Sequence, residues 1–186
     1  MTLTLAGKKI AILVANGFDE NQMAEIQRAL TKAKADIRTI SPEQGVVNGW
    51  QGEGWGHHFP VSAQIGEAMG SDFDMLVLPG GSRGVARLKT NPHTRRIINH
   101  FIAAEKPIAA IGEGVALLAL SGSLQDRILS APTEMHEELE AAGASISEEL
   151  LLIDSHLLTA DGNDLAAWVA ETIAFFADTG ILQAAA

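Results

Sequence analysis

The chain has 186 residues, of which 47% are hydrophobic, and its 13 basic and 23 acidic residues give a formal net charge of −10. A chain of this length and composition can bury a substantial core, and no low-complexity linker divides it, so we expect a single domain over residues 1–186. The acidic balance argues against nucleic acid as a partner, because phosphate binding depends on clustered Lys and Arg side chains. Cysteine is absent, which excludes disulfides, thiolate catalysis and thiolate metal sites.

No apolar run in the sequence approaches the length that spans a membrane. The apolar stretch after Lys8 and Lys9 is too short for the core of a signal peptide. We therefore expect a cytoplasmic protein without a membrane partner.

The first part of the chain has the pattern of a strand, a helix and a second strand. Residues 9–15 are apolar without interruption after Lys9, which is typical of a parallel strand covered on both faces. Met23, Ile26 and Leu30 then repeat at helical spacing, and residues 36–41 alternate as a second strand. This order predicts a βαβ unit with its crossover helix.

Residues 44–61 interrupt this alternation. They are rich in glycine and contain several aromatic and imidazole side chains, namely Trp50, Trp55, His57, His58 and Phe59. The pattern predicts a hairpin rather than a further crossover helix. Exposed aromatic side chains on such a hairpin indicate a contact between subunits, since soluble monomers seldom expose apolar patches. We expect a homodimer or a larger homo-oligomer.

The rest of the chain returns to strands and helices. Residues 73–78 predict a buried strand that stops at the glycine-rich residues 79–84, and Pro92 begins a helix. A short strand within 122–130, an amphipathic helix over 133–142, a hairpin over 151–159 and a C-terminal helix follow. This alternation predicts an α/β fold with a doubly wound, mostly parallel sheet flanked by helices. Ligands of such sheets bind beyond the carboxyl ends of the strands.

The stretch 106–120 contains a glycine corner between a buried strand and an apolar helix. The corner consists of Gly112, Glu113 and Gly114. Glycine allows backbone angles that other residues resist, and the free N–H groups at a helix N-terminus point into the adjoining crevice. Enzymes place nucleophiles at corners of this kind. Here Glu113 is the one side chain with reactive chemistry that the corner offers.

Loops 16–22, 80–84 and 112–114 should meet at the ligand edge of the sheet, and the segments around them share a family pattern. ILVANGFDENQ, GWGHHFPV, FDMLVLPGG, KPIAAIGEG and the stretch that begins AAGASISEELLLIDSH occur in this order. With them the chain resembles the ThiJ/PfpI superfamily, the intracellular protease I and deglycase-like relatives of class I glutamine amidotransferases, over nearly its whole length. The resemblance implies a flavodoxin-like, class I glutamine amidotransferase-like fold.

The catalytic residues of that family are missing at the matching positions. Its elbow normally reads AICHGP, with a cysteine nucleophile followed by histidine, and an acid from the first helix poises the cysteine. This chain places Gly112 at the cysteine position, Glu113 at the histidine position and, on an ungapped match, Gln22 at the acid position. A neutral Gln22 beside Gly112 has no thiolate to activate. The resemblance therefore implies the fold without the cysteine-dependent activity.

The candidate ligand-binding residues lie on the loops at this edge, and they are Glu113, Gly80, Gly81, Gln22 and Arg83. Gly80 and Gly81 resemble the oxyanion hole of the family, and they either donate N–H groups to an anion, with help from Arg83, or form a tight turn. Glu113 is either a general base or ligand-binding carboxylate, or a residue that caps a helix end.

Other polar residues near this edge have ordinary structural alternatives. Asp19 and Glu20 either supply a second carboxylate by a slipped register or cap the first helix. His57 and His58 are adjacent, so they point to opposite sides of a strand and do not form a ligand pair. No Walker loop, dinucleotide fingerprint or zinc-protease motif occurs. We expect no metal and no cofactor.

We therefore predict a degenerate ThiJ/PfpI-fold protein without cysteine-dependent hydrolase, deglycase or glyoxalase activity. It would act in the stress response, by binding a small polar or carbonyl metabolite or by assembly. The alternative is a working enzyme of the family type in which Glu113 replaces the thiolate as base or nucleophile and Gly80 and Gly81 donate to a carbonyl substrate. A third possibility is a structural partner, since large-subunit catalases carry an appended domain of this type without the nucleophile.

Overall fold

The structure, a computed structural model, describes the backbone of residues 2–185 and the side chains of residues 2–180. Its centre is a seven-stranded sheet in the order β11-β12-β8-β7-β1-β3-β6. The strands are β1 (Lys9–Leu13), β3 (Asp36–Ser41), β6 (Ala63–Gln64), β7 (Met75–Leu78), β8 (Ile108–Ile111), β11 (Leu151–Asp154) and β12 (Leu157–Ala160). All paired neighbours are parallel except β11, which runs antiparallel to β12.

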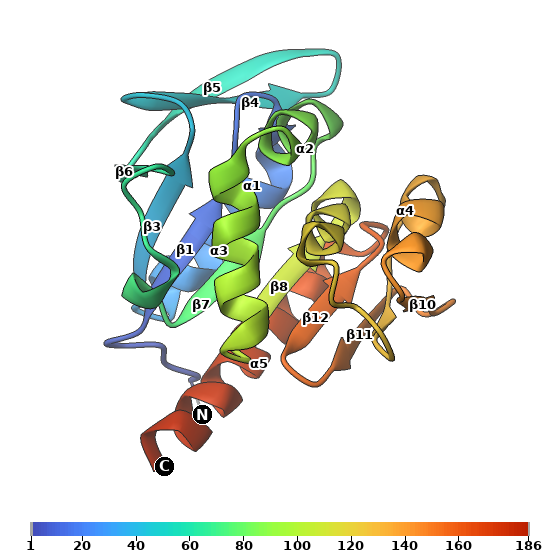
Figure 1. The fold of residues 1–186 in the computed structure, drawn as a ribbon. Helices are drawn as coiled ribbons and strands as arrows, with labels where there is room; N and C mark the ends of the chain where they lie inside the picture. The colour runs from blue at the N-terminus through green and yellow to red at the C-terminus, as the bar shows by residue number, and fades with distance from the viewer. Residues whose placement is uncertain (1, 186) are drawn as a thin grey trace.

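Helices cover both faces of this sheet, because successive residues of the central strand belong to different cores. Ile10 and Ile12 pack in the core that includes α1 (Glu20–Lys32) and α5 (Leu165–Ala185). Ala11 and Leu13 pack in the core that includes α3 (Pro92–Ala103) and the 3₁₀ helix η2 (Gly112–Ser121). Figure 1 shows α3 in front of the sheet. The doubly wound, mostly parallel sheet predicted from the apolar strands is confirmed.

A second sheet lies above the carboxyl end of β1 and contains the expected hairpin. Its three strands are β2 (Phe18–Asp19), β4 (Val46–Gln51) and β5 (Gly54–Pro60), in the order β2-β4-β5. β4 and β5 are antiparallel, with a shift of register between Asn48 and Trp50. Figure 1 shows this hairpin across the top of the molecule. The hairpin prediction for residues 44–61 is therefore confirmed.

No helix was predicted from the sequence between the glycine-rich residues 79–84 and Pro92. The structure has α2 (Ser82–Lys89) there, and Val85 and Leu88 are its buried apolar residues. Gly84 lies inside this helix because its backbone closely approaches the loop that follows β1: an added Cβ would lie 2.8 Å from the Ala15 carbonyl oxygen. The glycine that favours a loop in the sequence thus serves close packing of a helix.

The apolar segment after the glycine corner is a ten-residue 3₁₀ helix, η2, rather than an α-helix. Its apolar residues are buried on nearly all sides, so the sequence carries no amphipathic period that separates one helix type from the other. The expected helix 133–142 divides into η3 (Thr133–Met135) and α4 (His136–Ala141). The remaining short elements are η1 (Gly70–Asp72) and the parallel pair β9 (Ile128–Leu129) and β10 (Ser145–Ile146).

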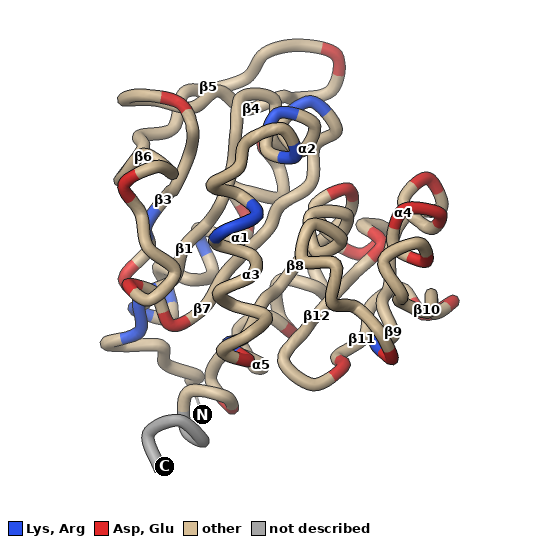
Figure 2. The backbone as a smooth tube through the Cα atoms, viewed as in Figure 1, with Lys and Arg blue, Asp and Glu red and all other residues tan. Residues whose placement is uncertain are grey.

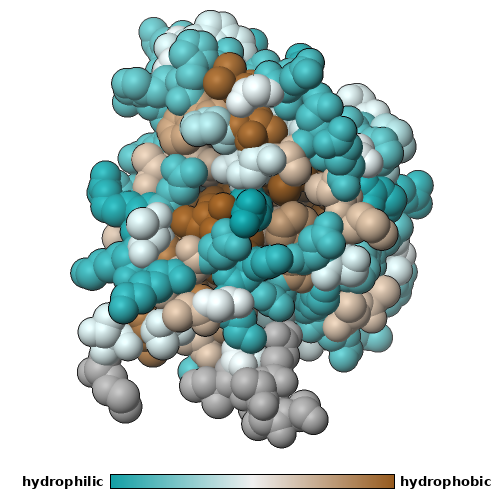
Figure 3. All heavy atoms as spheres, turned by 90° about the vertical axis from the view of Figure 1, so that its left-hand side faces the viewer, coloured by the Kyte–Doolittle hydropathy of each residue, from teal (hydrophilic) through white to brown (hydrophobic). Residues whose placement is uncertain are grey.

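Charge is unevenly distributed over the fold. Figure 2 shows Asp and Glu gathered on α4 and the segments beside it, whereas α2 and α3 carry several Lys and Arg residues. The face turned to the viewer in Figure 3 is mostly hydrophilic, with apolar atoms in a recess near its middle and a smaller group near the top. Of the helices that the structure describes, none combines the length and the apolar character needed to cross a bilayer.

Candidate functional site

Three loops meet at the carboxyl edge of the central sheet, following β1, β7 and β8. The Asp19 N–H donates to the Gly80 carbonyl oxygen over 2.9 Å. The Gly80 N–H donates to Gln22 Oε1 over 2.7 Å, and the Gly81 N–H donates to Glu113 Oε2 over 2.9 Å. These hydrogen bonds place Gln22, Gly80, Gly81 and Glu113 at a single site.

The corner after β8 has an unusual backbone at Gly112. Its φ is 58°, in the left-handed region that costs a residue with a side chain about 1–2 kcal/mol. A Cβ added to Gly112 would lie 3.5 Å from Gln22 Nε2 and 3.9 Å from Gly80 Cα, which are ordinary van der Waals distances. The corner therefore has room for a side chain, and backbone strain is the main obstacle to one.

The two N–H groups considered as anion donors both have partners inside the protein. Gln22 Oε1 accepts from Gly80, and Glu113 Oε2 accepts from Gly81. An oxyanion hole acts through donors that are preorganised around the position of the developing charge. An anionic group at this site would have to displace an amide oxygen and a carboxylate before it met those donors.

Glu113 caps a helix other than its own. Gly81 is the N-cap residue of α2, with φ of 104°, and its N–H is the group that donates to the Glu113 carboxylate. A carboxylate at this position also interacts favourably with the positive end of the helix dipole. The half-buried Glu113 side chain thus joins the start of η2 to the start of α2.

A pocket of about 340 Å³ opens beside Glu113. Its lining comes from α1, the hairpin turn, the start of α2 and the corner, and consists of Asp19, Asn21, Trp50, Gln51, Gly52, Gly81, Ser82 and Glu113. Asp19 is the N-cap of α1, and its Oδ1 accepts from the Gln22 N–H at 3.0 Å. The capping role considered for Asp19 is thus observed, and its carboxylate also lines the pocket.

Arg83 lies in the first turn of α2 and turns toward the hairpin. Its guanidinium carbon is 4.2 Å from the centroid of the Trp50 ring, within the range of a cation–π interaction. Trp50 also meets Trp55 edge to face, with 5.2 Å between ring centroids, and donates its indole N–H to the Gly52 carbonyl oxygen. The structure therefore places Arg83 against the Trp50 ring rather than among the residues that line the pocket.

Glu20 is buried beneath the hairpin and anchors it. Its Oε2 accepts from the His57 N–H at 2.7 Å, and its Oε1 lies 2.5 Å from His57 Nδ1. Gly49 and Gly56 provide the space, since an added Cβ would lie 2.6 Å and 1.7 Å from Glu20 Oε2. Burial opposes the charge, but the hydrogen bonds from His57 outweigh it and hold the pKa of Glu20 below its ordinary value. Sequence reasoning missed this role, for which the two hairpin glycines are the available signal.

The histidines are dispersed over the fold. His57 pairs with Glu20, and His58 Nδ1 pairs with the Asn48 side chain on the other side of β5. His100 contacts Lys106 Nζ at 3.1 Å, and burial, aided by the Lys106 charge, lowers the pKa of His100. In the part of the chain that the structure describes, no three His, Asp or Glu side chains are grouped so as to hold a metal ion.

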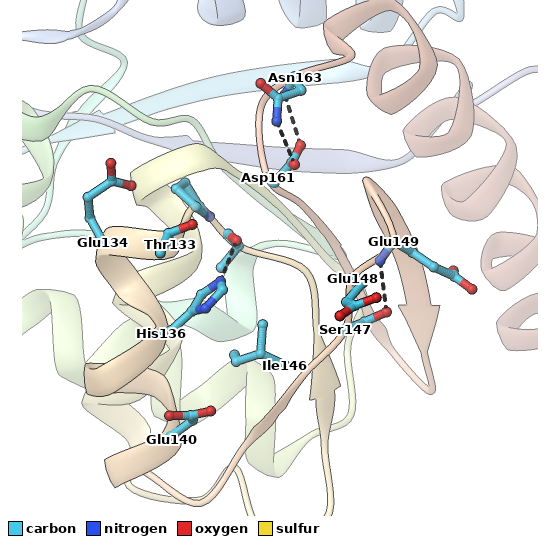
Figure 4. Close-up of a pocket in the computed structure, with 12 residues that line it drawn as sticks. Thr133, Glu134, His136, Glu140, Ile146, Ser147, Glu148, Glu149, Asp161 and Asn163 are labelled. Atoms are coloured by element: carbon cyan, nitrogen blue, oxygen red, sulfur yellow. Dashed lines mark hydrogen bonds between the residues drawn. The ribbon is translucent and has the colours of Figure 1, made fainter.

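A larger cavity of about 690 Å³ lies among the segments that follow β9, β10 and β12. Figure 4 shows its carboxylates, which come from separate segments: Glu134, Glu140, Glu148, Glu149 and Asp161. His136 Nε2 pairs with the Ala131 carbonyl oxygen at 2.9 Å, and Asn163 hydrogen-bonds to Asp161. None of the candidate ligand-binding residues inferred from the sequence lines this cavity.

This geometry defines an α/β protein of the flavodoxin-like type, with its candidate site at the carboxyl edge of a parallel sheet. The site is built on a glycine loop after β7 and a glycine corner after β8. The chain belongs to the DJ-1/PfpI family, whose profile matches residues 8–174. The resemblance to the ThiJ/PfpI superfamily inferred from the sequence is thereby confirmed.

Relatives in two bacteria match most of the chain. General stress protein 18 of Bacillus subtilis (strain 168) is 29% identical over 171 residues, which are 90% of this chain and 97% of that protein. An uncharacterised protein of Staphylococcus aureus (strain Mu50) is 29% identical over 154 residues, which are 82% of this chain and 88% of that protein.

Two solved structures share the fold. A ThiJ/PfpI domain protein from Brachyspira murdochii superposes with a TM-score of 0.81 at 18% identity, over 91% of this chain and 96% of that one. A protein from Anabaena variabilis with DJ-1/ThiJ/PfpI-like and ferritin-like domains superposes with a TM-score of 0.82 at 23% identity, over 90% of this chain. The match covers 49% of that two-domain chain, about half its length.

Proposed function

We propose that this DJ-1/PfpI protein has a degenerate active site, lacks cysteine-dependent hydrolase and deglycase activity, and acts by small-molecule binding or by assembly in the stress response. The observation that carries the proposal is the pairing of both glycine N–H groups with side chains of the chain itself, Gly80 with Gln22 and Gly81 with Glu113. Similarity to General stress protein 18 supports the stress context. The cytoplasmic location expected from the sequence stays a prediction.

The chemistry of the corner supports the loss of the thiol reaction. Gly112 offers no nucleophilic atom, and the chain contains no cysteine that could replace it. Gln22 is a neutral amide that accepts a hydrogen bond from Gly80, so it cannot take a proton from a nucleophile as a carboxylate would. Covalent catalysis needs a nucleophile within reach of a base, and Gly112 and Gln22, at the family's cysteine and acid positions, supply neither member of that pair.

A second candidate function is supported by the position of Glu113 on the pocket wall. Glu113 Oε2 accepts from Gly81, and among the described residues no hydrogen bond engages Oε1. In an enzyme that uses this carboxylate, Oε1 would act as a general base toward a carbonyl compound. The paired state of the Gly80 and Gly81 donors disfavours this role, because the developing oxyanion would find no free N–H group there.

Methylglyoxal consumption separates the two functions. Purified wild type, the Glu113→Gln variant and a cysteine-containing family member as positive control are assayed side by side. We expect wild type and variant to match the protein-free rate while the control turns over. Turnover by wild type that disappears in Glu113→Gln would contradict the proposal and establish the Glu113 enzyme.

Assembly is the second part of the proposed function, and the hairpin supports it. Trp55 is 60% exposed and Val46 is 49% exposed. β5 pairs with β4 along one side and has no strand partner on the other within the described chain, and a free edge of this kind invites pairing with another chain. We propose a homodimer or a larger homo-oligomer.

Light scattering tests the assembly. We expect wild type at micromolar concentration to give at least the mass of a dimer, and Trp55→Ser to shift the distribution toward the monomer. A monomeric wild type at this concentration would contradict the assembly.

A further inference from the structure

We propose that the pocket beside Glu113 binds a small organic cation, an ammonium or guanidinium group carried on a compact apolar body. This inference rests on the proposed function, because it takes the degenerate corner to be a binding site. It adds the chemical class of the ligand, which follows from the donors, the acceptors and the charges around the pocket.

The donors nearest Glu113 are already used. The Gly81 N–H donates to Glu113 Oε2, and the neighbouring Gly80 N–H donates to Gln22 Oε1. A helix N-terminus ordinarily attracts an anion, but at α2 the Glu113 carboxylate already provides that negative charge. The chain thus supplies its own anion at this position and disfavours a second one.

The acceptors, in contrast, are available. Both charged residues of the lining are acidic, Glu113 and Asp19, and neither Lys nor Arg is among the lining residues. Asp19 uses Oδ1 to cap α1 and Glu113 uses Oε2 on Gly81, and within residues 2–180 no hydrogen bond engages Asp19 Oδ2 or Glu113 Oε1. Hydrogen bonds from a cation to such carboxylate oxygens are the strong, charge-assisted kind.

Among the described residues, Arg83 forms no ion pair with Glu113 or Asp19. Its guanidinium lies over the Trp50 ring, and Arg83 is not among the residues that line the pocket. The half-buried Trp50 ring supplies an apolar surface beside the two carboxylates. With about 340 Å³, the pocket lies near the lower end of the about 300–1,000 Å³ typical of small-molecule sites, which limits the ligand to a compact body.

The larger cavity of Figure 4 is the competing location for a cation. It carries more carboxylates than the pocket beside Glu113 but has no Phe, Tyr or Trp in its lining. A protonated arylalkyl amine therefore distinguishes the two sites, since the pocket beside Glu113 combines two carboxylates with the indole ring of Trp50. A variant in each site shows which one holds the probe.

Three probes with the same ring and different charges test the proposal: benzylamine, benzyl alcohol and benzoate. Binding is followed by the NMR resonance of the Trp50 indole N–H, which the Trp50→Phe variant assigns. We expect benzylamine to shift this resonance and to bind wild type about tenfold more tightly than benzyl alcohol, because hydrogen bonds to charged groups exceed neutral ones. Benzoate should leave the resonance unchanged.

Glu113→Gln removes the charge but keeps an oxygen that can accept from Gly81, so the corner should remain folded. We expect this variant to lose the tenfold preference for benzylamine, while the matched control Glu134→Gln, in the larger cavity, keeps it. If wild type bound benzylamine and benzyl alcohol equally, the proposal that the ligand is a cation would be overturned, although the pocket would still be a binding site. Loss of amine binding in Glu134→Gln alone, or no binding of any probe, would overturn the proposal. Failure of the proposed function would instead appear as wild-type turnover of methylglyoxal.

Discussion

Glu113 Oε2 accepts a hydrogen bond from the Gly81 N–H over 2.9 Å, between residues 32 positions apart in the chain. The bond places a carboxylate at the start of α2, where an enzyme of this design would hold the oxyanion of its substrate. Together with the bond from Gly80 to Gln22, it occupies both N–H donors of the potential anion site with side chains of the protein itself.

Replacing Glu113 by Ala should destabilise the fold, because the N-cap N–H of α2 loses its acceptor. Loss of a helix-capping acceptor costs about 0.5–2 kcal/mol, and urea unfolding measures it. Glu113→Gln should cost less, since its side-chain oxygen can still accept from Gly81. Glu137→Ala, an exposed carboxylate on α4, is the control and should leave the midpoint nearly unchanged. A midpoint for Glu113→Ala equal to that of the control would contradict the capping role.

The catalytic arrangement of the family should be recoverable at this corner. The triple variant Gly112→Cys, Glu113→His and Gln22→Glu would place a thiol at the start of η2, where the helix N-terminus and hydrogen-bonding partners favour the thiolate. A side chain at a φ of 58° costs about 1–2 kcal/mol, so stability is measured alongside reactivity. We expect the introduced thiol to have a lowered pKa.

The rate of iodoacetamide alkylation, measured as a function of pH, gives the pKa of the introduced thiol. Ala104→Cys, in a second variant, provides a reference thiol at the end of α3. A folded triple variant whose thiol titrates like the reference would show that the corner has lost its preorganisation.

β1 was predicted from the sequence, whereas α2 was not, and the two elements show why. The unbroken apolar run of β1 predicted a strand covered on both faces, because its side chains must enter two cores. α2 could not be predicted in the same way, since two of its eight residues supply its apolar contacts and Gly84 favours a loop. Its glycine is explained by the approach to Ala15, a tertiary contact that no local pattern records.

The candidate site was predictable in position but not in connectivity. Glycine corners after two parallel strands, together with the first loop, predicted that Gln22, Gly80, Gly81 and Glu113 would meet. Which side-chain oxygen accepts from which N–H depends on side-chain geometry at distances near 3 Å. The roles of Glu20 and Trp50 were missed for the same reason, because both depend on how the hairpin folds over α1 and α2.

Glu20 should contribute folding stability that is lost at acidic pH. Its pKa in the folded protein is lowered, with burial opposing the shift and the His57 hydrogen bonds producing it. The Glu20 carboxylate therefore binds a proton less readily in the folded state than in the unfolded state. The stability that this carboxylate contributes is present above the pKa of an unfolded Glu, about 4.3, and is lost as pH falls through the lower pKa of the folded state. Glu20→Gln should be less stable than wild type at neutral pH and lose less stability on acidification.

Urea midpoints between pH 3 and pH 7 test this dependence, with Glu25→Gln on the exposed side of α1 as the control. Parallel pH profiles for wild type and Glu20→Gln would contradict the role of the Glu20 carboxylate.

His156 should destabilise the protein at mildly acidic pH. Its side chain is buried, its Nε2 has no hydrogen-bond partner among the described residues, and burial, aided by the Arg127 charge, lowers the pKa of the ring. The unfolded state then binds more protons below its pKa of about 6.5, so stability is full above that pH and declines as pH falls. Glu105 and Asp154 oppose the shift.

His156→Leu should reduce the loss of stability at acidic pH. It should therefore raise the unfolding temperature more at pH 5.5 than at pH 7.5. Differential scanning calorimetry at the two pH values measures both effects, with the exposed His58→Gln as the control. An equal shift at both values would mean that packing rather than protonation governs the position.

Amide hydrogen exchange at Gly80 and Gly81 tests the closed anion site most directly. Both N–H groups should exchange far more slowly than that of Gly52, an exposed glycine of the hairpin turn, because each is held by a side-chain acceptor. In Glu113→Ala the protection of Gly81 should fall while that of Gly80 persists, and in Gln22→Ala the order should reverse. Exchange of Gly81 in wild type as fast as that of Gly52, or unaffected by Glu113→Ala, would contradict the internal occupation of the site.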